Sequence, residues 1–91
     1  MIVRILGEGQ FRLPDETIDE LNRLDAALEG ALDADEVTFR AALDALLARV
    51  RQAGSPVADE ALAASDVVLP FADASAADVR ELLTEEGLIP G

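Results

Sequence analysis

Two consecutive stretches with apolar residues at helical spacing constrain the fold of this chain more than any other feature. The first predicts an amphipathic helix over approximately residues 16–29. The second runs from Val37 to Val50 and predicts a helix with Asp33 as its N-cap and its end near residues 49–51. Because so few residues separate the two helices, we expect them to form an antiparallel αα-hairpin.

The first thirteen residues predict a β-hairpin. The sequence Gly7-Glu8-Gly9 lies between two runs rich in apolar residues, and glycine supplies the backbone freedom that a hairpin turn needs. A turn centred on Glu8 would pair Arg4 with Arg12 on one face, and Val3 with Leu13 and Ile5 with Phe11 on the other. We therefore expect one apolar face and one face that carries two guanidinium groups.

The remainder of the chain predicts a loop, a strand and a helix. The loop covers Ser55 to Ser65, with room for one helical turn at residues 60–64, and Asp66–Pro70 is predicted to be a third strand beside the hairpin. Asp73 or Ser75 would cap the last helix, which would turn Val79, Leu82 and Leu83 inward and end at Gly87.

These elements predict a single α+β domain over residues 1–91. We expect a small antiparallel sheet, made of the N-terminal hairpin and a short third strand, that packs on the αα-hairpin and a short C-terminal helix. The chain has only three aromatic residues, so the core must consist mainly of leucine with valine and isoleucine.

The residue types that are missing exclude most catalytic chemistry. The chain has no histidine, cysteine or lysine, which excludes a zinc site with nitrogen and sulfur ligands, a thiolate nucleophile, a Ser-His-Asp triad and a Walker A loop. The acidic clusters lack the ligand pattern of an EF-hand, so we interpret them as helix-end and surface charge. The sequence therefore predicts a protein that is not an enzyme, with no catalytic residue, no metal and no cofactor.

The charge balance restricts the partners. Nineteen acidic residues against seven arginines give a net charge of −12, and anionic lipid surfaces and nucleic acids repel such a body. No stretch resembles a signal peptide, and no apolar run approaches the length that spans a bilayer. We expect a cytoplasmic protein that binds no nucleic acid and does not insert directly into a membrane.

Two features have both a structural and a functional interpretation. Arg4 and Arg12 are either held by Asp66 or a helix carboxylate, or they form a patch for carboxylates of a partner. The stripe that runs from Phe39 to Val50 is interpreted as core, although its width would allow one edge to receive a partner helix.

Three segments resemble the PspA-associated protein family (PspAA) of archaea and actinobacteria, and the likeness runs from end to end. They are the opening Met1-Ile2-Val3-Arg4-Ile5-Leu6-Gly7-Glu8-Gly9-Gln10-Phe11, the internal Ser65-Asp66-Val67-Val68-Leu69-Pro70 and the closing Glu85-Glu86-Gly87-Leu88-Ile89-Pro90-Gly91. The family is linked to phage shock protein A, a coiled-coil membrane-remodelling protein of the envelope stress response. The resemblance implies a non-catalytic accessory or adaptor role.

An adaptor for a PspA-like coiled-coil protein would reach the membrane only through that partner, and it could also self-associate as a homo-oligomer. The expected binding residues are the acids at the start of the first helix, Asp15, Glu16, Asp19 and Glu20, with Arg4 and Arg12 as the second choice. The alternative is an acidic inhibitor or nucleic-acid mimic, which predicts acids spread over one continuous face.

Overall fold

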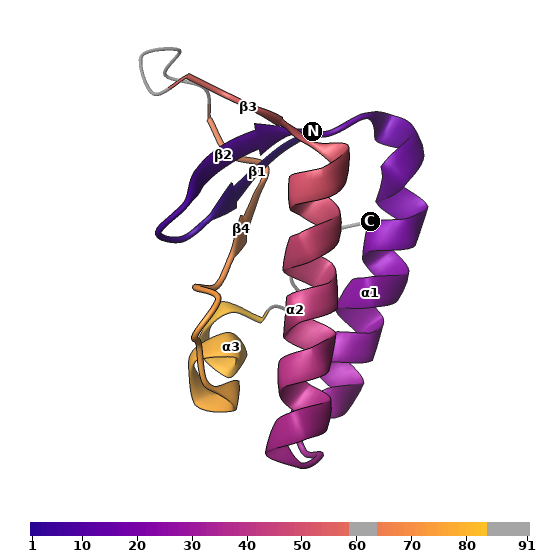
Figure 1. Ribbon diagram of the computed structural model, residues 1–91, viewed down its shortest axis with the longest axis vertical. Helices are drawn as coiled ribbons and strands as arrows, with labels where there is room; N and C mark the ends of the chain where they lie inside the picture. Colours follow the sequence, from indigo (N-terminus) through magenta and orange to yellow (C-terminus); the bar gives the residue numbers. More distant parts are fainter. Residues whose placement is uncertain (59–63, 84–91) are drawn as a thin grey trace.

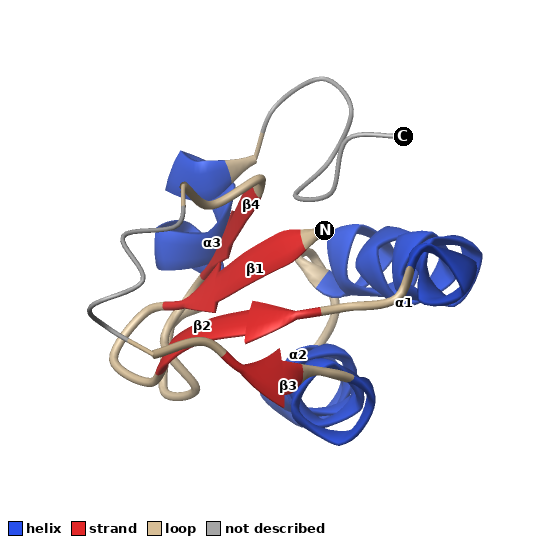
Figure 2. Ribbon diagram, turned by 90° about the horizontal axis from the view of Figure 1, so that it is seen from above, coloured by secondary structure: helices blue, strands red, loops and turns tan. Residues whose placement is uncertain are grey.

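The computed structural model describes residues 1–58 and 64–83, which form an α+β fold as expected. The sheet has four strands in the order β3-β2-β1-β4, and the described helices gather against one of its faces (Figures 1 and 2). It is a mixed sheet, because β1 pairs antiparallel with β2 but parallel with β4. The strands are β1 (Ile2–Ile5), β2 (Gly9–Arg12), β3 (Ser55–Pro56) and β4 (Val67–Leu69).

The αα-hairpin is present. A 3-10 turn, η1 (Asp15–Thr17), leads into α1 (Ile18–Ala31), and α2 (Glu36–Ala53) lies beside α1 (Figure 1). The predicted N-cap of the second helix is wrong by two residues, because the chain continues to turn after α1 and Asp35 supplies the cap. Its side chain accepts a hydrogen bond of 2.7 Å from the backbone N–H of Thr38.

The hairpin is present, but its predicted register is wrong. Arg4 lies opposite Gln10 and Arg12 lies opposite Ile2, so the two guanidinium groups are not paired. The turn is centred on Gly7 instead of Glu8, because the N–H of Glu8 donates to the carbonyl of Ile5 at 2.9 Å. Gly7 has a φ of +84°, the left-handed conformation that a type II turn requires at its third residue.

The third strand is confirmed, and the predicted loop contains a fourth. β4 adds to the free edge of β1, with Val3 opposite Val67 and Ile5 opposite Leu69. Ser55 and Pro56 were expected in a loop but form β3, because the chain leaves α2 at Gly54 directly alongside β2. The helical turn expected at residues 60–64 lies outside the described residues except for Ala64.

The last helix, α3 (Ala76–Leu82), begins with a capping box. The Ser75 hydroxyl accepts from the N–H of Asp78, and the Asp78 carboxylate accepts from the N–H of Ser75, both at 3.1 Å. Val79 is fully buried, and Leu82 and Leu83 pack half-buried against the core. Ser75 is thus the cap, while the expected end at Gly87 lies outside the described residues.

The core forms where the helices meet the sheet. The apolar stripe of α2 is buried over its whole length: Phe39, Leu43, Leu46, Leu47 and Val50. It therefore belongs to the core, and no edge of it is left to receive a partner helix. Val3 and Ile5 of β1 and Leu21 and Leu28 of α1 belong to the same cluster, together with buried residues from β4 and α3. Val68 points to the opposite, outer face of the sheet, where it is 38% exposed.

Candidate functional site

The four acidic residues predicted to bind a partner lie in η1 and the first turn of α1, and we call them the acidic edge: Asp15, Glu16, Asp19 and Glu20. Asp15 lies 3.8 Å from the N-terminal ammonium group, and Glu20 accepts a hydrogen bond of 2.5 Å from Arg49 of α2. Glu16 and Asp19 are exposed and form no ion pair with another residue of the described segments. Two of the four predicted binding residues, Asp15 and Glu20, therefore have a partner within the chain.

The structure does not bring Arg4 and Arg12 together with an acid of the described segments. Both lie exposed on the outer face of the sheet. Asp66 was one of the acids that the structural interpretation offered as their partner, but one of its carboxylate oxygens accepts from the N–H of Ile2 at 2.8 Å. Within residues 1–58 and 64–83, neither arginine has an ion pair, so the structural interpretation of this pair loses its expected partner.

Arg51 links the end of α2 to the hairpin turn. Its Nε donates to one oxygen of Glu8 at 2.7 Å and its second nitrogen donates to the other at 2.5 Å, a bidentate contact. The hydrogen bond from Arg51 lowers the pKa of Glu8 below its ordinary value, and Glu8 in turn raises the pKa of Arg51. Through this ion pair, Glu8 joins the hairpin turn of the sheet to the end of α2.

Other arginines also join elements of the fold. Arg40 of α2 donates to the carbonyl of Ala72 at 2.8 Å, which holds the loop between β4 and α3. Arg80 of α3 pairs with Asp33 in the turn between α1 and α2. Together with Arg49 and Arg51, these side chains are occupied by intramolecular contacts and are poor candidates for binding.

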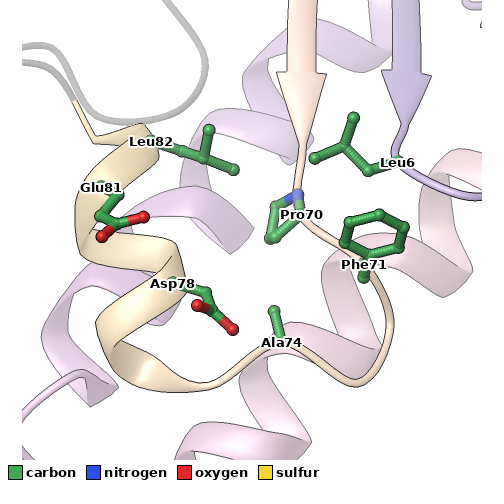
Figure 3. Close-up of a pocket in the computed structure, with 7 residues that line it drawn as sticks. All are labelled: Leu6, Pro70, Phe71, Ala74, Asp78, Glu81 and Leu82. Atoms are coloured by element: carbon green, nitrogen blue, oxygen red, sulfur yellow. The ribbon is translucent and has the colours of Figure 1, made fainter.

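A shallow pocket lies between the end of β1, the end of β4 and α3 (Figure 3), and we call it the Phe71 pocket. Its volume is about 250 Å³, and its lining comprises Leu6, Pro70, Phe71, Ala74, Asp78, Glu81 and Leu82. Sequence reasoning missed this site because its walls come from segments more than sixty residues apart. The available signal was the large aromatic side chain that follows Pro70 without a helical or strand pattern to bury it.

Two carboxyl groups of the described residues have a lowered pKa. The pKa of Asp35 is lowered by its hydrogen bonds with Thr38, as that of Glu8 is by Arg51, so neither carboxyl group holds a proton near neutral pH as a general acid must. The described segments hold no group of three or more acidic, histidine or cysteine side chains placed to bind a metal ion. Among these same residues, no helix combines the length and apolarity needed to cross a bilayer.

Comparison with known proteins gives one family. The sequence model of the family described as PspA-Associated protein matches residues 1–91, the whole chain. No curated protein and no solved structure matches the chain significantly. The chain belongs to the PspA-associated protein family, as its terminal motifs indicated.

Proposed function

From this family membership, we propose that the chain is a non-catalytic accessory protein that binds a PspA-like coiled-coil protein in the envelope stress response. The name of the family suggests a role related to PspA. We further propose that the chain acts as an adaptor and that its partner is a coiled coil. The residues that bind this partner are also proposed here.

The observation that supports it best is the unneutralised charge of the acidic edge. Glu16 and Asp19 are exposed and spaced three residues apart, so their carboxylates lie on the same side of the helix start. In the described segments neither has an arginine to neutralise it, unlike Glu20. A long helical partner with basic side chains would supply the missing charge, and such complementarity sets orientation and association rate.

The net charge of −12 supports an indirect route to the membrane. Anionic lipids would repel this surface, so the basic or amphipathic contact with lipid must belong to the partner. We place the chain in the cytoplasm, and at the membrane only when its partner brings it there.

The test is binding of the purified chain to a purified PspA-like coiled-coil protein. The variant Glu16→Arg/Asp19→Arg should weaken binding by about tenfold at low salt and flatten its salt dependence. Glu29→Arg/Asp73→Arg is the matched control, because it changes the net charge equally at two other exposed acids. Glu20 is left unchanged, since its reversal would also break the contact with Arg49.

Arg4→Glu/Arg12→Glu tests the outer face of the sheet separately, as the second-choice surface. Loss of binding in this variant alone would indicate that the partner contacts the outer face of the sheet instead of the acidic edge. If the wild-type chain does not bind the coiled-coil protein even at low salt, the proposed function is wrong.

The alternative, an acidic inhibitor or nucleic-acid mimic, receives less support. A mimic needs carboxylates that stand free over one face, whereas arginines of the same chain engage several of them: Glu8, Glu20, Asp33 and Glu36. Competition with duplex DNA for a DNA-binding protein would favour the mimic.

A further inference from the structure

We propose that the Phe71 pocket receives one apolar side chain of a basic amphipathic helix on a partner protein. The pocket is distinct from the acidic edge: α3 lies at the lower left of Figure 1 and the start of α1 at the upper right. The inference rests on the proposed function only for the identity of the protein that carries such a helix.

The pocket contains a half-exposed aromatic ring. The ring already touches the hairpin turn, so it cannot move further in that direction to become buried. Phe71 is 51% exposed, one of three large apolar side chains that are exposed in the described residues. A Cβ added at Gly7 would lie 2.9 Å from two ring carbons, so the ring already touches the turn backbone. Pro70 and Ala74 are buried beside it. Half-exposed aromatic rings of this kind are typical anchors of protein interfaces.

Hydrogen bonds within the chain hold the walls of the pocket in place. The N–H of Leu6 donates to the carbonyl of Leu69, and that of Ala74 to the carbonyl of Phe71, both at 3.0 Å. Arg40 holds the intervening loop through the carbonyl of Ala72, and the capping box holds the start of α3. Preformed walls reduce the ordering cost of binding.

The rim of the pocket is acidic, so it favours a ligand that carries positive charge. Figure 3 shows Asp78 and Glu81 on the α3 side of the pocket, three residues apart in the sequence. Asp78 already accepts the capping hydrogen bond from Ser75, whereas Glu81 has no ion pair within the described residues. A lysine or arginine one helical turn from the apolar anchor would be placed to pair with Glu81.

The size of the pocket limits what enters it. A volume of about 250 Å³ is at or below the lower limit for small-molecule sites, so it suits one leucine or aromatic side chain rather than a cofactor. The rim carboxylates and the charge of −12 disfavour a second copy of this chain as the occupant. A basic helix that contributes a single anchor satisfies both the volume and the charge.

The experiment uses a synthetic helical peptide with lysines on one face and leucines on the other, about 18 residues long because shorter helices are marginal in water. A single tryptophan replaces the central leucine. The protein has no tryptophan or tyrosine, so all tryptophan emission reports the peptide. We expect a saturable blue shift with the wild-type chain and none with a peptide in which glutamate replaces lysine. A scrambled peptide of equal composition measures nonspecific attraction to the acidic surface.

Two variants test the site from its apolar and its charged side. Phe71→Ser and Glu81→Arg should each weaken peptide binding by about tenfold or more. Val37→Ser is the control for an exposed apolar residue elsewhere, since Val37 is 79% exposed on α2, and Glu29→Arg is the control for charge. Both controls should stay within about twofold of the wild type, and circular dichroism should show that all four variants fold.

The outcomes separate this inference from the proposed function. The proposal that the pocket binds the helix would be wrong if the amphipathic and scrambled peptides bound equally well. It would also be wrong if the test and control variants lost peptide affinity equally. Self-association of the wild type that Phe71→Ser abolishes would also overturn it, because a second copy would then be the occupant. If the peptide binds at the pocket but the coiled-coil protein does not bind at all, the inference stands and the proposed function falls.

Discussion

Gly7 and Phe71 approach so closely that a Cβ on Gly7 would lie 2.9 Å from both Cδ1 and Cε1 of the Phe71 ring. The contact joins the turn of the N-terminal hairpin to the end of β4, more than sixty residues later in the chain. Gly7 also has a φ of +84°, where other residues are strained. One glycine therefore serves the turn and leaves room for the ring that lines the pocket.

Gly7→Ala should lower the free energy of unfolding by about 1–2 kcal/mol, because alanine is strained at this φ. Urea unfolding followed by circular dichroism measures the change. Gly30→Ala is the matched control: Gly30 lies in α1 with nothing within 4 Å of an added Cβ, so the same substitution should stabilise by roughly 0.5–1 kcal/mol. Effects of equal sign at both positions would contradict the assignment.

Leu43→Ala and Leu46→Ala should each cost about 2–5 kcal/mol, because both side chains are fully buried and truncation leaves a cavity. Chemical denaturation at constant pH gives the values. Val37→Ala on the same helix should change stability by no more than about 0.5 kcal/mol, since Val37 is 79% exposed. A loss under about 1 kcal/mol at both leucines would mean that the stripe is not packed as described.

Glu8→Gln should make stability less dependent on pH. The Arg51 hydrogen bonds lower the folded-state pKa of Glu8 from its ordinary value of 4.5, so the folded protein binds fewer protons than the unfolded chain. The contribution of the pair is therefore fully present above pH 4.5 and is lost as the pH falls through the lowered pKa. The difference in the free energy of unfolding between the two proteins should be largest near about pH 7 and should shrink as the pH falls below 4.5. A constant difference would contradict the assignment.

Exhaustive chelation should leave the melting temperature unchanged, because the sequence lacks the ligand pattern of a calcium loop. Calorimetry before and after dialysis against a chelator measures this. Divalent ions also screen an acidic surface nonspecifically, so a titration with sodium chloride of matched ionic strength is the control. A saturable shift at micromolar calcium would show a site that the sequence pattern does not predict.

Local patterns in the sequence determined most of the elements, although not β3. The apolar spacing predicted both helices, the paired glycines predicted the hairpin, and Ser75 was one of two predicted caps for α3. A strand was predicted at Asp66–Pro70 and forms at Val67–Leu69. These features depend on residues a few positions apart, whose backbone preferences and side-chain spacing act before distant segments meet.

The tertiary structure decided how the elements meet. The sequence pattern predicted a turn centred on Glu8, whereas the paired strands are centred on Gly7, which separates Arg4 from Arg12. The pairing of Glu20 with Arg49 likewise depends on how α1 and α2 pack.

The Phe71 pocket requires Leu6 and Leu82 to meet across most of the chain. No local pattern encodes such a meeting, because the packing of the whole core determines which exposed side chains end up as neighbours.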